Sequence, residues 1–121
     1  MKTAELTGVA LDWAVAVAEG GTDFGTDGIT YGFKLHGRLK VLATGWALTM
    51  SYHPSTDWKQ GGPIIEREKI CTDFLLNGQW LAISRTTEKQ GYGPTPLIAA
   101  MRCYVASKLG DNTEIPEELT Q

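Results

Sequence analysis

Residues 69–85, "KICTDFLLNGQWLAISR", contain the strongest structural signal in the chain. Two β-prone runs, "KICTDFLL" and "QWLAISR", flank the dipeptide Asn77-Gly78. Asn-Gly tolerates the positive φ that both central residues of a type I′ turn require, so the pattern is typical of a β-hairpin with a two-residue turn. We therefore expect an antiparallel sheet with this hairpin at its centre.

A helix is predicted directly after the hairpin, in "GPTPLIAAMRCYVASKLGD". Thr95 is a suitable N-cap, Pro96 fits the first helical position and Gly110 fits the C-cap. Apolar side chains recur along one face of this segment at helical spacing, from Leu97 to Val105.

A second helix is predicted near the start of the chain, in "LTGVALDWAVAVAEGG". Its apolar residues are three and four apart, between Thr7 as N-cap and Gly20 as C-cap. Both helices need a sheet face against which to bury their apolar sides. The predicted fold class is therefore α+β, a small antiparallel sheet with a central hairpin, packed by an N-terminal and a C-terminal helix.

The length of 121 residues and a hydrophobic content of 42% allow one buried core. We expect a single α+β domain over residues 1–110 and a loosely attached acidic tail, "DNTEIPEELTQ", over 111–121. The glycine-rich region 20–45 predicts turns between short strands such as "ITYGFKL" and "LKVLAT".

Composition excludes several classes of protein. A formal net charge of -3 argues against a protein that holds extended nucleic acid by neutralising many phosphates. The longest apolar run, residues 9–18, contains Asp12 and is shorter than the roughly 20 residues that span a bilayer. No membrane association and a cytoplasmic location are expected. Cys71 and Cys103 are far apart and without a CxxC pair, which favours reduced thiols.

The stretch "YHPSTDWKQGGPIIERE", residues 52–68, combines unusually varied chemistry. Pro63 fits the first position of a short helix, "PIIEREK", whose unpaired backbone N–H groups after Gly61-Gly62 could receive a phosphate or carboxylate. Trp58 could stack on a base and Arg67 could contact an anion. In the alternative interpretation Trp58 covers the core and the charged residues form a solvated face. The candidate ligand residues of this stretch are Tyr52, Ser55, Thr56, Asp57, Trp58, Gly61, Gly62 and Arg67.

Residues 91–96, "GYGPTP", repeat this arrangement before the last helix. Tyr92 supplies a ring, Gly93 lets the backbone approach a ligand and Thr95 supplies a hydroxyl. The alternative is simple helix initiation by Thr95-Pro96. Because two positive helix ends near one another favour an anion between them, we predict that residues 52–68 and 91–96 converge on one pocket.

No catalytic or metal-binding pattern stands out. His36 and His53 lack a metal-ligand spacing, and Asp57 near His53 is a common pairing without catalysis. The chain contains no GxSxG, P-loop or GxGxxG motif. The sequence therefore indicates neither an enzyme nor a metal nor a cofactor.

Three ordered motifs resemble one family. They are "ELTGVALDWAVAVAEG", "YHPSTDWKQGGPIIERE" and "YGPTPLIAAMRCYVASKLGD", and together they look like the NinX family of small phage proteins. That family is encoded in the accessory region of lambdoid phages and was long classed as a domain of unknown function. The resemblance implies a small protein in the cytoplasm of the infected bacterial host, without an established activity to transfer.

Three hypotheses for function follow. The leading one is a non-enzymatic phage accessory protein that binds a small anionic, nucleotide-type ligand and so sequesters a host immune signal. The second is a protein-interaction factor that modulates a phage or host recombination or replication protein. The third, a nucleotide hydrolase, needs a metal site that the sequence does not indicate. A homo-oligomer is also expected, because a pocket for a nucleotide is more easily built between copies of so small a chain.

Overall fold

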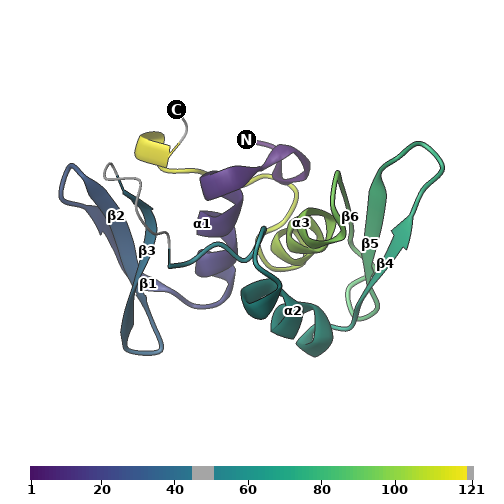
Figure 1. Ribbon diagram of the computed structural model, residues 1–121, viewed down its shortest axis with the longest axis horizontal. Coiled ribbons are helices and arrows are strands. Elements are labelled where there is room, and N and C mark those ends of the chain that lie inside the picture. The colour runs from purple at the N-terminus through teal and green to yellow at the C-terminus, as the bar shows by residue number, and fades with distance from the viewer. Residues whose placement is uncertain (45–50, 120–121) are drawn as a thin grey trace.

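The computed structural model describes residues 1–44 and 51–119 (Figure 1). Gly45, the last residue of the predicted glycine-rich region, and residues 120–121 of the predicted tail lie outside this range. Two antiparallel sheets stand at opposite ends of the molecule, with helices α1 (Gly8–Ala18) and α3 (Pro96–Leu109) side by side between them. The predicted α+β class is confirmed, with two small sheets in place of one.

The predicted hairpin forms the core of one sheet, in which β4 (Ile70–Phe74), β5 (Trp80–Ser84) and β6 (Gln90–Gly93) follow in order. The turn differs from the prediction. Leu75 and Gln79 close the loop with an N–H···O bond of 2.8 Å, and only Gly78 of the Asn-Gly pair has positive φ, 87°. This is a three-residue loop in which glycine takes the left-handed position, because a longer turn also matches the twist of the strands.

This sheet lies unusually close to α3. A Cβ atom at Gly91 would collide with the backbone of Ala99 and Cys103, and one at Gly93 would lie 2.9 Å from Ile98. The absence of side chains at these two positions therefore lets β6 pack directly on the helix. The boundaries of α3 are as predicted: the Thr95 hydroxyl accepts from the N–H of Ile98 at 3.1 Å.

The other sheet consists of β1 (Thr22–Thr26), β2 (Thr30–Leu35) and β3 (Arg38–Thr44), of which β2 and β3 correspond to the predicted segments "ITYGFKL" and "LKVLAT". Its inner face is aromatic. The ring of Phe33 stacks on Phe24 at 5.0 Å and meets the edge of Tyr52 at 5.1 Å. Helix α1 lies between this sheet and α3, so its residues on both sides are fully buried: Leu11, Ala14, Val15 and Ala16.

The middle helix corrects the sequence prediction. Helix α2 spans Trp58–Arg67 and begins five residues before Pro63, which lies inside it. The carboxylate of Asp57 caps the helix by accepting from the N–H of Lys59 at 3.0 Å, and the Gly61 N–H donates to the Asp57 carbonyl at 2.9 Å. Asp57 is a preferred N-cap residue, and it outweighs the Gly-Gly-Pro signal. The N–H groups after Gly62 therefore do not lie at a helix start.

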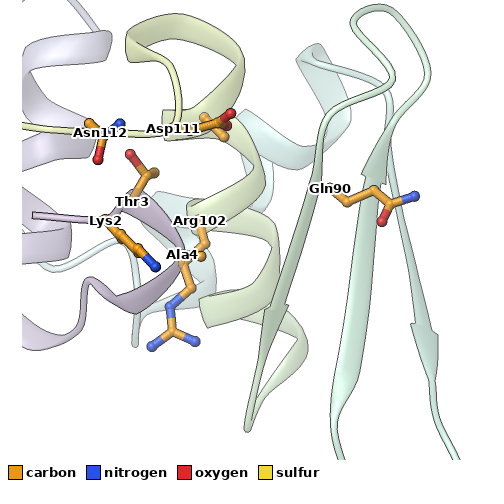
Figure 2. Close-up of a pocket in the computed structure, with 8 residues that line it drawn as sticks. Lys2, Thr3, Ala4, Gln90, Arg102, Asp111 and Asn112 are labelled. Atoms are coloured by element: carbon orange, nitrogen blue, oxygen red, sulfur yellow. The ribbon is translucent and has the colours of Figure 1, made fainter.

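The C-terminal segment is attached to the N-terminus rather than loose (Figure 2). The N–H of Thr3 donates to the Asp111 carbonyl and the N–H of Thr113 donates to Met1, both at 2.9 Å. The buried Thr3 and Thr113 hydroxyls are 2.8 Å apart, and Leu119 is buried in the core. Short 3-10 turns, η1 (Thr3–Glu5) and η2 (Glu117–Leu119), lie at the two ends.

Candidate functional site

A groove lies between the sheet β1–β2–β3 and α2, at the end of the sheet where β2 turns into β3. Its volume is about 430 Å³. We call it the basic groove, and its lining residues are Glu19, Leu35, His36, Arg38, Lys40, Tyr52, Gln60 and Ile64.

Two cations enter this groove from the inner face of β3. Lys40 is paired in register with Phe33 and Arg38 with Leu35, so both share a face with the buried Phe33. Within residues 1–44 and 51–119, neither Arg38 nor Lys40 makes an ion pair or side-chain hydrogen bond. Unpaired cations on the core-facing side of a strand leave the groove with uncompensated positive charge.

Tyr52 forms the floor. Its side chain is 6% exposed, and its hydroxyl has no hydrogen-bond partner in the described part of the chain. Burial raises the pKa of the Tyr52 phenol, so the hydroxyl stays protonated and available as a donor. The ring and Ile64 give the groove an apolar base beside the cations.

Gln60 holds this floor in position. Its Oε1 accepts from the N–H of His53 at 2.7 Å, and its Nε2 donates to the Ser51 carbonyl at 2.9 Å. The side chain thereby ties the first turn of α2 to the segment that carries Tyr52. The N–H of Tyr52 itself donates to Val41 of β3 at 3.1 Å.

A buried carboxylate of α1 also holds the segment that carries Tyr52. Asp12 of α1 is 5% exposed, and its Oδ1 accepts from the N–H of Ser55 at 2.9 Å. Burial raises the pKa of Asp12 to about 6. Two further atoms of the segment, His53 Nδ1 and Ser55 Oγ, are buried and have no hydrogen-bond partner among the described residues.

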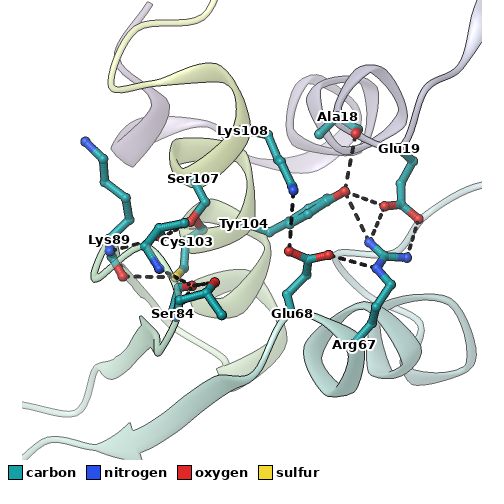
Figure 3. Close-up of polar contacts among 12 residues, drawn as sticks. Ala18, Glu19, Arg67, Glu68, Ser84, Lys89, Cys103, Tyr104, Ser107 and Lys108 are labelled. Carbon is teal, nitrogen blue, oxygen red and sulfur yellow. Dashed lines mark hydrogen bonds and ion pairs between the residues drawn. The ribbon is translucent and has the colours of Figure 1, made fainter.

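Arg67 takes part in a network of charged residues beside the groove (Figure 3). It contacts Glu19 at 2.5 Å, Glu68 at 2.8 Å and the Tyr104 hydroxyl at 3.2 Å. These two carboxylates compensate its charge, and the hydrogen bonds to Glu19 raise the pKa of Arg67. Tyr104 also donates to Glu19, which lines the groove.

The structure distributes the predicted residues of 52–68 among several roles. Tyr52 alone of the candidates lines the basic groove. Ser55 is buried, Asp57 is the cap of α2, and Thr56 and Trp58 are exposed. Gly61 permits close packing, since a Cβ there would lie 2.5 Å from Leu97. Gly62 is half-buried beside the Trp58 ring.

The two predicted stretches meet only in part. The Gly61–Leu97 approach brings the start of α2 beside the start of α3. Thr95, however, uses its hydroxyl as a cap, and Gly93 faces α3, so Tyr92 between two buried glycines points to the opposite face of its sheet. The basic groove includes no residue of 91–96. The ligand-binding roles of these residues stay predictions.

The sequence reading missed Arg38, Lys40, Gln60 and Asp12 as site residues. A signal for the first two exists in "RLKVLAT", because period-two alternation places Arg38 and Lys40 on the face of the buried Leu42. Asp12 in the middle of an apolar helix is a similar signal of a buried polar contact. Nothing local marks Gln60, whose role depends on the tertiary contact with Ser51 and His53.

A family model described as "Bacteriophage P22, NinX" matches residues 2–108. The chain belongs to this family. The match includes every lining residue of the basic groove, the first two motifs on which the resemblance rests, and the third motif up to residue 108. A search of curated proteins finds no match to this NinX chain. None of the helices within residues 1–44 and 51–119 has the length and apolar character needed to cross a bilayer.

Proposed function

We propose that this NinX-family protein binds a small anionic ligand of nucleotide type in the basic groove. The observation that carries the proposal is the pair of unpaired cations, Arg38 and Lys40, beside a buried tyrosine with a free hydroxyl. Two cations that lie close together on one strand and lack a carboxylate partner among the described residues favour an external anion.

The lining of the groove fits a molecule with one charged and one less polar end. Arg38, Lys40 and His36 suit phosphate oxygens, while Tyr52, Leu35 and Ile64 suit a base or sugar. Glu19 offers carboxylate oxygens that can accept from a ribose hydroxyl or an amino group. A volume of about 430 Å³ lies within the range of roughly 300–1,000 Å³ typical of small-molecule sites.

The proposal extends to sequestration of a host immune signalling nucleotide in the cytoplasm of the infected bacterium. A phage protein that binds such a nucleotide without converting it lowers the free concentration of the signal available to the defence response. The family description names a bacteriophage, which gives this extension its setting in an infected bacterium. We also propose that a second copy of the chain covers the open side of the groove, which light scattering at tens of micromolar tests by giving a dimer or larger species.

The function is tested by thermal unfolding with mononucleotides, cyclic mono- and dinucleotides and ADP-ribose-type compounds. A ligand present at a hundred times its Kd adds about 2.7 kcal/mol to the free energy of unfolding. The ligand is then released by denaturation and analysed. Intact recovery supports binding without conversion, conversion indicates an enzyme, and no shift with any compound contradicts the nucleotide proposal.

A second candidate function is interaction with a phage or host recombination or replication protein. It is supported by exposed apolar side chains at the β4–β5 hairpin of the sheet β4–β5–β6. Leu76 is fully exposed at the hairpin loop, and Phe74 beside Trp80 is 57% exposed. Such apolar side chains suit a protein partner. Replacing Leu76 and Phe74 by Ser should abolish a partner complex of this kind and leave nucleotide binding unchanged.

A further inference from the structure

A second cavity, of about 230 Å³, lies between the N-terminal segment, α3 and β6 (Figure 2). It shares no lining residue with the basic groove, so it is a separate place on the molecule. Its lining residues are Lys2, Thr3, Ala4, Gln90, Arg102, Ala106, Asp111 and Asn112.

Arg102 is held rigidly in this cavity by neutral groups. Its Nε donates to the Leu6 carbonyl at 2.8 Å and its Nη1 donates to the Tyr92 carbonyl at 2.7 Å. Within the part of the chain that the structure describes, Nη2 has no partner and no carboxylate lies within ion-pair distance of the guanidinium. Burial removes hydration from the guanidinium and lowers the pKa of Arg102.

Lys2 adds a second positive charge. Its backbone is fixed by a bridge to Asn112, and its side chain makes no ion pair with any described residue. The one carboxylate in the wall, Asp111, is bound to Lys89 at 3.4 Å. Figure 2 shows the ends of Lys2 and Arg102 directed the same way, with the Asp111 carboxylate at the opposite end of the cavity.

We propose that this cavity binds a phosphate-type dianion, either as the free ion or as the head group of a small phosphate monoester. A fixed guanidinium with a free N–H edge recognises tetrahedral oxyanions, and an ammonium beside it balances the second charge. The side-chain amide of Asn112, which also lines the cavity, can supply a neutral donor. The cavity is below the roughly 300 Å³ at which sites for larger ligands begin, so it suits a compact anion.

The test is a titration of isotope-labelled protein with sodium phosphate at constant ionic strength, followed by the backbone amide signals of Lys2 and Asn112. We expect saturable shifts at these residues, separate from any shift at Gly37 beside the basic groove. Lys2→Gln should weaken phosphate binding about tenfold, and Arg102→Gln should weaken it at least as much. Lys59→Gln, an exposed lysine on α2, is the matched control and should leave the affinity unchanged.

Arg102→Gln also removes two structural hydrogen bonds. Lys2→Gln, whose side chain makes no hydrogen bond or ion pair with the described residues, keeps the test decisive if the first variant does not fold. A parallel titration with glycerol 3-phosphate compares a monoester with the free ion, and tighter binding of one identifies the source that the cavity prefers. Unsaturable shifts with both compounds, or wild-type affinity in Lys2→Gln, would overturn the proposal.

Discussion

The two sheets share the same simple order of strands, but they meet the helices in opposite ways. In the sheet β4–β5–β6, glycines at positions 91 and 93 remove the side chains that would separate strand from helix, so the layers touch. In the sheet β1–β2–β3, the inner face continues past the aromatic core into Arg38 and Lys40, and the layers part into the basic groove. Close packing serves stability in the first case, and the gap leaves room for a ligand in the second.

The largest effect is expected where the layers touch. Gly91→Val places a side chain against the backbone of Ala99 and Cys103, which cannot move without unwinding α3. We expect a loss of about 3 kcal/mol or more in the free energy of unfolding, measured by urea denaturation. Gly25→Ala is the matched control, because a Cβ at Gly25 meets nothing within 4 Å and should change stability by less than about 0.5 kcal/mol. Equal stability of the two variants would contradict the close-packed interface.

The half of the molecule that holds the groove should also respond to pH through Asp12. Its folded pKa of about 6 lies above the reference value of 3.8, so the folded state binds the proton more tightly than the unfolded state. The resulting stabilisation is present below pH 4 and is lost as pH rises through 6, by up to about 3 kcal/mol for a shift of this size.

Asp12→Asn removes this dependence while keeping an oxygen for the Ser55 N–H. The free energy of unfolding of the variant minus that of the wild type should therefore increase as the pH rises from 4 to 7. Urea denaturation at several pH values measures it. A constant difference across this range would show that Asp12 is not buried in this way.

A smaller effect is expected at Arg67, beside the groove. Its side chain is 50% exposed, so Arg67→Ala should cost only about 1 kcal/mol of stability despite its contacts with Glu19 and Glu68. The sequence predicts a further loss of about 1.5 to 3 kcal/mol in ligand binding if Arg67 contacts the anion. Unfolding and ligand titration on the same variant separate the two roles, and unchanged affinity would restrict Arg67 to the charge network.

The fold was largely predictable from local signals. The Asn77-Gly78 hairpin, the Thr95 cap of α3 and the strands of the glycine-rich region each depend on residues adjacent in sequence. The start of α2 was not predictable from local signals, because Asp57 and Gly61-Gly62-Pro63 both favour a helix start. The helix begins after Asp57, whose carboxylate caps it. The division into two sheets follows from α1 and α3 packing on each other, which no short stretch of sequence specifies.

The candidate site was less predictable. Of the candidate ligand residues in 52–68, Tyr52 lines the basic groove, but caps, close contacts and the Arg67 network account for much of the varied chemistry of this stretch. The cations that give the groove its charge lie in β3, where alternation along the strand was the available signal. Whether these two cations face solvent or a groove depends on where α2 packs, which is determined by tertiary contacts.

The proposed ligand binding depends most directly on Arg38 and Lys40 as the anion contacts of the basic groove. Arg38→Gln, Lys40→Gln and the control Lys34→Gln are titrated with the nucleotide that gives the largest thermal shift. Lys34 carries the same charge on the same sheet, but it points to the opposite face, where Asp23 lies 3.9 Å away. The account predicts that each groove variant binds about tenfold or more weakly, whereas Lys34→Gln binds like the wild type. Equal affinities in all three variants would contradict it.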